Sequence, residues 1–156
     1  MLAMPEQDYG LDMSYPLEGT LLAFDFGSKK MGIAVGQTIT MTATALDPIK
    51  MQDGIPNWDV LTQLIKKWQP CAIVVGMPYN EDRPQQQVFF AARKFARRLQ
   101  QRYKLPVFGM DEHLTSFAAR EQLRELGGNR ALEKNSVDSI AAQIILESWL
   151  RTYCCG

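Results

Sequence analysis

The 156-residue sequence predicts one α/β domain, with a mixed sheet of about five strands and helices on both faces. Two observations on the pattern predict this class. Three strand-like runs come first, and segments of helical and strand-like periodicity then alternate to the end of the chain. A hydrophobic content of 46% and a charged content of 22% are typical of a globular protein, and the length suits one domain rather than two.

The first three predicted strands form an antiparallel meander. Residues 20–26 are a mostly apolar run that reaches Gly27, which is typical of a central buried strand. Residues 28–30 predict a tight turn into a second strand over 31–37, so the two strands form a hairpin. Residues 38–45 alternate threonine with apolar residues and predict the third antiparallel strand.

The rest of the chain predicts αβ units. Apolar residues at helical spacing predict a helix that ends before Pro70, with Asn57 or Asp53 as its N-cap. Two short apolar runs, 71–75 and 106–109, predict buried strands. Further helices are predicted over 88–103, 114–126 and 136–150. In open α/β sheets of this kind, ligands bind at the carboxyl ends of the strands.

The charges are balanced overall but segregated along the chain. The 17 basic and 17 acidic residues exclude a uniformly basic binder, although a local basic patch remains compatible. Residues 1–28 contain five acids and no base, whereas residues 83–104 contain seven bases and no acid, which indicates an anionic partner. We predict a flexible acidic extension over 1–18, a folded domain over 19–152 and a tail over 153–156.

Several classes of protein are disfavoured by composition. No apolar run is long enough to span a bilayer, and the N-terminus lacks the features of a signal peptide, so we expect a cytoplasmic protein without a membrane partner. The three cysteines form no C-x-x-C pair, which disfavours a disulfide framework and a zinc site. Because His113 is the only histidine, a metal site would need oxygen ligands.

Acidic residues lie where such a site is expected. Asp25 interrupts an apolar strand, where a buried charge is costly unless it is paired or binds a metal; the alternative is a carboxylate bonded to backbone amides. Asp111 and Glu112 follow the last strand, where they either form part of a site or favour the N-terminus of the next helix. Asp138, near the start of the last helix, either caps it together with Asn135 or joins the other acids in holding a divalent metal.

Four segments, in this order and spacing, resemble the YqgF (RuvX-type) family over residues 19–151: LLAFDFGSKKMGIAVG, VVGMPYN, PVFGMDEHLTS and VDSIAAQIILESWL. Members are RNase H-like Holliday junction resolvases, also described as pre-16S rRNA nucleases. The resemblance implies an RNase H-like fold and a trio of catalytic, metal-binding carboxylates at Asp25, Glu112 and Asp138. It therefore selects Glu112 over Asp111, which the residues alone leave undecided.

The resemblance implies a nuclease that hydrolyses phosphodiester bonds with two Mg²⁺ or Mn²⁺ ions about 4 Å apart. We expect Asp25 to bridge the ions, Glu112 to bind one and Asp138 the other. The expected function is 5′-end processing of pre-16S rRNA in ribosome biogenesis, by a monomer or weak homodimer. The alternatives are a Holliday junction resolvase acting on branched DNA and a non-catalytic protein that binds RNA or a transcription complex. A phosphotransferase of the sugar-kinase type would need a second domain.

Other residues are candidates for contacting a nucleic acid. The candidate substrate-binding residues are Gly27, Ser28, Lys29, Lys30, Arg93, Arg97 and Thr115. Each has a plainer alternative, because glycine suits a hairpin turn, basic side chains are often only solvated, and threonine often caps a helix. The family pattern normally has arginine where this chain has His113 and threonine where it has Ser28. The loop over 79–84 also differs, so no family role carries over to it.

Overall fold

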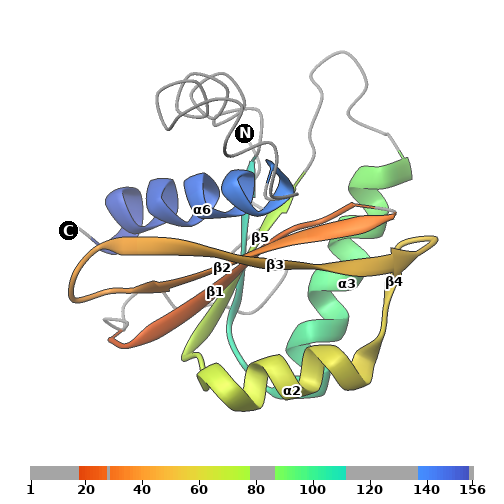
Figure 1. The fold of residues 1–156 in the computed structure, drawn as a ribbon, viewed down its shortest axis with the longest axis horizontal. Helices are drawn as coiled ribbons and strands as arrows, with labels where there is room; N and C mark the ends of the chain where they lie inside the picture. The colour runs from red at the N-terminus through yellow and green to blue at the C-terminus, as the bar shows by residue number, and fades with distance from the viewer. Residues whose placement is uncertain (1–17, 28, 78–86, 112–136, 155–156) are drawn as a thin grey trace.

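A computed structural model describes residues 18–27, 29–77, 87–111 and 137–154 (Figure 1). A six-stranded mixed sheet lies between helices α2 and α3 on one face and α6 on the other. The strands are β1 (Thr20–Asp25), β2 (Lys30–Gln37), β3 (Thr42–Gln52), β4 (Ile55–Pro56), β5 (Ala72–Met77) and β6 (Val107–Asp111). The helices are α2 (Trp58–Trp68), α3 (Gln87–Tyr103), α6 (Val137–Trp149) and the π-helical segment η2 (Leu150–Cys154).

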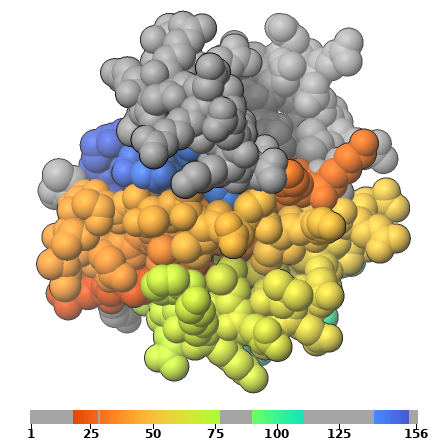
Figure 2. Space-filling view, in the orientation of Figure 1, coloured from red at the N-terminus to blue at the C-terminus, as the bar shows by residue number. Residues whose placement is uncertain are grey.

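The strand order is β4-β3-β2-β1-β5-β6. Strands β1, β2 and β3 pair antiparallel, and β5 and β6 extend the sheet from β1 in parallel. The predicted class, a meander followed by αβ units with helices on both faces, is confirmed. Figure 2 shows β3 running across the front of the molecule, between α6 above and α2 below. Among the described helices, none is long and apolar enough to cross a membrane.

The sheet has six strands rather than about five. The third strand begins at Thr42, whereas the sequence pattern predicts a strand over 38–45. Met41 has a left-handed φ of 58°, and its N–H donates to the Gln37 carbonyl at 2.9 Å, so residues 38–41 form a turn instead of strand. The strand then continues to a second turn at Asp53 and Gly54, both at positive φ, which returns the chain as the two-residue β4. The predicted helix over 114–126 and the extension over 1–18 lie largely or wholly outside the described residues.

Alternation along β1 divides the core into two layers. Leu22 and Phe24 are buried with residues of α3 and α2, whereas Leu21 and Ala23 are buried with residues of α6. This central strand is covered on both faces, which explains its nearly continuous apolar sequence. The same alternation fixes the side of the sheet on which later residues of β1 lie.

Helices α2 and α3 begin and pack as the apolar patterns predict. The Asn57 side chain caps α2 by accepting hydrogen bonds from the N–H groups of Asp59 at 3.0 Å and Val60 at 3.3 Å. Gln69, in a left-handed conformation, ends the helix before Pro70. Buried side chains at helical spacing attach α3 to the sheet, and these are Ala92, Phe95, Ala96 and Leu99.

Helix α6 approaches β2 closely at Gly36. A Cβ atom added at Gly36 would lie 2.8 Å from Leu146 Cδ2 and 2.8 Å from the Thr42 carbonyl oxygen. Further along the helix, the Trp149 ring lies 4.6 Å from that of Phe108 on β6. The absent side chain at Gly36 therefore leaves room for the Leu146 side chain of α6 and for the Thr42 carbonyl group of β3.

We expect Gly36→Ala to lower the free energy of unfolding by about 1–3 kcal/mol, because the added methyl group overpacks the interface between α6 and β2. Chemical denaturation measures the change. Lys30→Ala, at an exposed position of the same strand, is the matched control and should change stability by no more than about 0.5 kcal/mol. Equal stability of both variants would contradict the close packing at Gly36.

Candidate active site at the carboxyl edge of the sheet

Two of the acidic segments predicted from the sequence meet at one edge of the sheet. Strands β1, β5 and β6 are parallel, so their carboxyl ends lie together. Asp25 is in register with Gly76, and Met77 is in register with Asp111. Asp25 therefore lies two strands from the end of β6, about 10 Å across the sheet at the usual strand spacing.

Asp25 ends β1 on the side of the sheet that α6 covers. It is half-buried, and it shares the alternation of Leu21 and Ala23, whose side chains pack with α6. Leu22 and Phe24 face the other helices. The sequence signal, an acid in an apolar strand, thus corresponds to a carboxylate at the rim of the core rather than in its centre.

The first turn of α6 lies over the same place. Ser139 is fully buried, and its Oγ accepts a hydrogen bond from the Ile33 N–H at 3.3 Å. Ile33 is the direct antiparallel partner of Phe24, the neighbour of Asp25. This bond places the first turn of α6 beside the last residues of β1.

The sheet is irregular where Ser139 contacts it. The pairing between β2 and β3 shifts, because Met31 pairs with Ile49 but Ile33 pairs with Leu46. The extra residue on β3 lies in the Asp47–Pro48 segment, and proline has no N–H to donate. Ser139 is therefore a side-chain acceptor for the backbone at a break in the ladder. Sequence analysis missed it, because one serine in an apolar helix carries no periodic signal.

Gly27, in the turn between β1 and β2, is required by the conformation of the backbone. A Cβ atom at Gly27 would overlap the carbonyl oxygen of Lys30, so the hairpin itself requires glycine there. The Lys29 carbonyl accepts from the Met51 N–H at 2.8 Å, which fixes the turn to β3. The side chains of Lys29 and Lys30 are exposed beside the carboxyl edge.

Helix α3 carries the basic segment. Arg97 is exposed and Arg93 is half-buried, and neither lies among the residues that pack on the sheet. On another side of the helix, the guanidinium carbon of Arg102 lies 4.1 Å from the centre of the Trp58 ring. Trp58 packs against the core and is half-buried, and this arginine lies over its ring.

The other predicted site residues lie outside the described part of the chain. They are Ser28, Glu112, Thr115 and the side chain of Asp138. The described residues accordingly contain no cluster of three potential metal ligands. Cys71 lies at the opposite end of β5, and burial raises the pKa of its thiol while a backbone hydrogen bond opposes that shift, which leaves it a poor nucleophile.

Comparison with known proteins places this geometry in a family. Residues 19–152 match the model of the family described as "RuvX: Holliday junction resolvase". The chain belongs to this family. It is 53% identical over 130 residues to an Actinobacillus pleuropneumoniae protein, covering 83% of this chain and 95% of that one. It is 52% identical over 133 residues to a Citrobacter koseri protein, covering 85% and 96%. Both relatives carry the name "Putative pre-16S rRNA nuclease".

Solved structures share the fold of this RuvX-family chain. Thermus thermophilus RuvC, in complex with a Holliday junction substrate, superimposes with a TM-score of 0.55 at 14% identity, covering 86% of this chain and 97% of that one. The yeast mitochondrial Holliday junction resolvase gives a TM-score of 0.51 at 10% identity, covering 88% and 79%. These likenesses confirm the predicted RNase H-like architecture.

We expect Ser139→Ala to destabilise the RuvX-family domain by about 1–3 kcal/mol, because the Ile33 N–H loses its acceptor in a buried place. Equilibrium denaturation followed by circular dichroism measures the loss. Ser148→Ala, on the same helix but with a hydroxyl that accepts from the exposed Arg151, is the control and should cost little. A Ser139 variant as stable as this control would show that the hydrogen bond does not hold α6 in place.

Proposed function

We propose that this protein is a metal-dependent nuclease that hydrolyses phosphodiester bonds in 5′-end processing of pre-16S rRNA. The family and the names of its close relatives support the activity and the substrate. The observation that carries the proposal is the meeting of β1, β6 and the first turn of α6 at one edge of the sheet. Asp25 ends β1, Glu112 directly follows β6, and Asp138 is the second residue of α6. This arrangement supports the proposal that the three carboxylates meet there.

The proposed catalytic and metal-binding trio is Asp25, Glu112 and Asp138. Alternation in β6 supports Glu112 over its neighbour: Phe108 and Met110 pack on the α6 side, whereas Val107 packs on the other side. A residue two positions after Met110 would share this side in a continued strand, which is the basis for proposing Glu112 rather than Asp111.

Helical periodicity supports Asp138. Positions 138, 142, 145 and 149 form one stripe at spacings of four, three and four residues. Ala142, Ile145 and Trp149 on this stripe are buried against the sheet. Position 138 is thus the N-terminal end of this sheet-facing stripe. This end of the stripe is the one nearest the carboxyl edge of the sheet.

The donor set suits hard divalent cations. Carboxylate oxygens are the preferred protein ligands of Mg²⁺ and Mn²⁺, and half-burial of Asp25 leaves room for ligands from solvent or substrate. Asp25, Glu112 and Asp138 would hold two such ions. When bound, the ions would supply an activated water and would neutralise charge at the phosphorus. The three side chains would thereby orient the scissile phosphate.

The substrate contacts are proposed around this edge. Lys29 and Lys30 are exposed in the turn that follows Asp25, and Arg93 and Arg97 extend from α3. Cationic side chains bind nucleic-acid backbones through the phosphates, without reading sequence. Gly27, Ser28 and Thr115 complete the proposed contacts. We also propose a cytoplasmic location and a monomer or weak homodimer.

A second candidate function is resolution of Holliday junctions. The description of the family model favours it. Cleavage-product mapping separates the two functions, with a pre-16S rRNA precursor and a four-way DNA junction tested in parallel with Mg²⁺ and Mn²⁺. We expect metal-dependent cuts at the 5′ side of the rRNA and none on the junction. Cuts only on the junction would reverse the assignment, and binding without cleavage of either substrate would indicate a non-catalytic protein.

We expect Asp25→Asn to abolish metal-dependent cleavage while the protein stays folded, because the amide keeps the shape of the carboxylate but removes its charge. Cleavage of labelled RNA and thermal melting are measured on the same preparation. Wild-type turnover by this variant would exclude the proposed site. Loss of activity together with unfolding would favour the alternative, in which Asp25 is bonded to backbone amides.

Asp138→Asn distinguishes a metal ligand from a helix cap. Asparagine also caps helices, so a capping role predicts a stability loss of about 1 kcal/mol or less and normal turnover. A metal role predicts nearly complete loss of cleavage with an almost unchanged melting temperature, which is the result we expect. Normal turnover by the variant would assign Asp138 to capping.

A further inference from the structure

We propose that Arg98 and Arg102 form a phosphate-binding site for the nucleic-acid strand in the groove between α3 and the start of α2, with Trp58 as the residue that positions Arg102. The site is separate from the carboxylate edge, and neither arginine belongs to the substrate contacts proposed above. The inference rests on the proposed function, because it assumes a nucleic-acid substrate.

A continuous series of ring contacts supports this site from beneath. The Phe95 ring lies 5.4 Å from that of Phe26, the residue after Asp25. On its other side, Phe95 stacks with Trp58 at 6.0 Å and an interplanar angle of 29°. The guanidinium carbon of Arg102 then lies 4.1 Å from the centre of the Trp58 ring. Arg102 is thus linked to the sheet through three aromatic residues.

This support makes Arg102 unlike an ordinary solvated arginine. A guanidinium group over an indole ring is attracted by the electrons of the ring, and its edge remains free to donate hydrogen bonds. The indole is itself fixed, because Trp58 is the first residue of α2, directly after the Asn57 cap, and packs on the core. Holding the side chain in one place reduces the entropy that it would lose on binding a phosphate.

The surroundings of Arg102 complement an anion. A groove of about 410 Å³ is lined by Trp58, Arg98, Gln101 and Arg102. Arg98 lies one helical turn before Arg102, and Gln101 adds a polar side chain, so both cations face one groove. Helix α3 contains no acidic residue. Asp59, exposed in the first turn of α2, is the acid next to Trp58 in the sequence and leaves an excess of positive charge.

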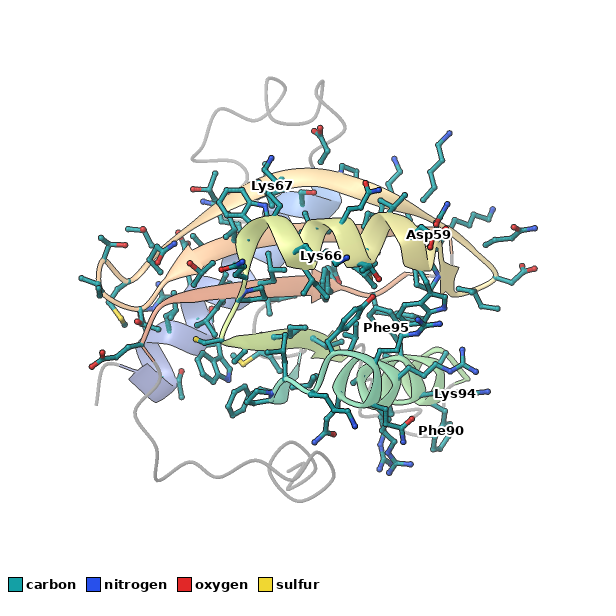
Figure 3. All side chains as sticks on the ribbon, turned by 90° about the horizontal axis from the view of Figure 1, so that it is seen from below. Asp59, Lys66, Lys67, Phe90, Lys94 and Phe95 are labelled. Atoms are coloured by element: carbon teal, nitrogen blue, oxygen red, sulfur yellow. The ribbon has the colours of Figure 1, made fainter. Side chains whose placement is uncertain are left out.

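Ring contacts connect the groove to Phe26, the residue that follows Asp25. Figure 3 shows Phe95 lying between α2 and α3, whereas Lys94 projects from α3 toward solvent. The ring contacts that begin at Phe26 end at the groove, so a strand bound at Asp25 reaches it by crossing the carboxyl edge of the sheet. A strand held both at Asp25 and in the groove would be kept in register with the carboxylates.

The test is RNA affinity at several monovalent salt concentrations, measured on the full chain with EDTA so that no cleavage occurs. Arg98→Gln combined with Arg102→Gln should flatten the slope of log K against log salt by roughly 1.4, since each phosphate contact to a single strand contributes about 0.7. The matched control is Lys66→Gln combined with Lys67→Gln, which removes two exposed charges from the far end of α2. We expect the control to keep the wild-type slope.

A second pair of variants tests the role of Trp58. Trp58→Leu keeps every charge but removes the ring, and should weaken RNA binding about two- to fivefold. Trp58→Phe keeps a ring beneath Arg102 and should restore most of the affinity. If both variants have the same melting temperature, a purely structural role of Trp58 predicts the same affinity for both. Equal affinity of Trp58→Leu and wild type would overturn the positioning role.

An unchanged slope of log K against log salt for the arginine double variant would overturn the site. An equal flattening of the slope for the lysine control would also overturn it, because the binding would then depend on diffuse positive charge. Metal-dependent cleavage by wild type separates these failures from failure of the proposed function. Wild-type cleavage with unchanged RNA binding by the arginine variant would overturn the groove alone. Absence of cleavage and of RNA binding by wild type would overturn both.

Discussion

The close approach of α6 to β2 determines where the acidic residues can meet. Gly36 lets the helix lie against the strand, and the hydrogen bond from the Ile33 N–H to Ser139 fixes the beginning of the helix along it. Without the first contact the helix would stand further from the sheet, and without the second it could slide along its axis. Both contacts therefore fix where the first turn of α6 lies relative to β1.

Charge separation follows from the same arrangement. Asp25 lies on the α6 side of the sheet, whereas the basic side chains belong to α3, which packs on the opposite face. The carboxylate of β1 and the basic residues of α3 are thus separated by the sheet. A polyanion with bound divalent cations matches this division, because cations neutralise the acids while arginines contact the remaining phosphates.

Much of the fold could be predicted from periodicity, because long apolar stripes and runs dominate its helices and central strands. The structure of residues 38–45 could not be predicted in this way. Their alternation of threonine with apolar residues suggests a strand throughout, but the chain turns at Met41, which has a left-handed conformation. Asp25 was identifiable because a charge in an apolar run is costly. Ser139 and the Arg102–Trp58 pair were not, because each depends on a partner distant in sequence. The choice of Glu112 over Asp111 came from resemblance alone.

We propose that α6 brings Asp138 beside Asp25 to hold a divalent cation. A crystal structure of the full chain grown with Mn²⁺, with data collected at a wavelength where manganese scatters anomalously, tests it directly. We expect an anomalous peak at the carboxyl edge of the sheet, with oxygen atoms of both Asp25 and Asp138 at about 2.0–2.2 Å, the distance usual for small hard divalent cations. A fully occupied peak elsewhere, with the Asp25 carboxylate bonded only to backbone amides, would contradict the claim.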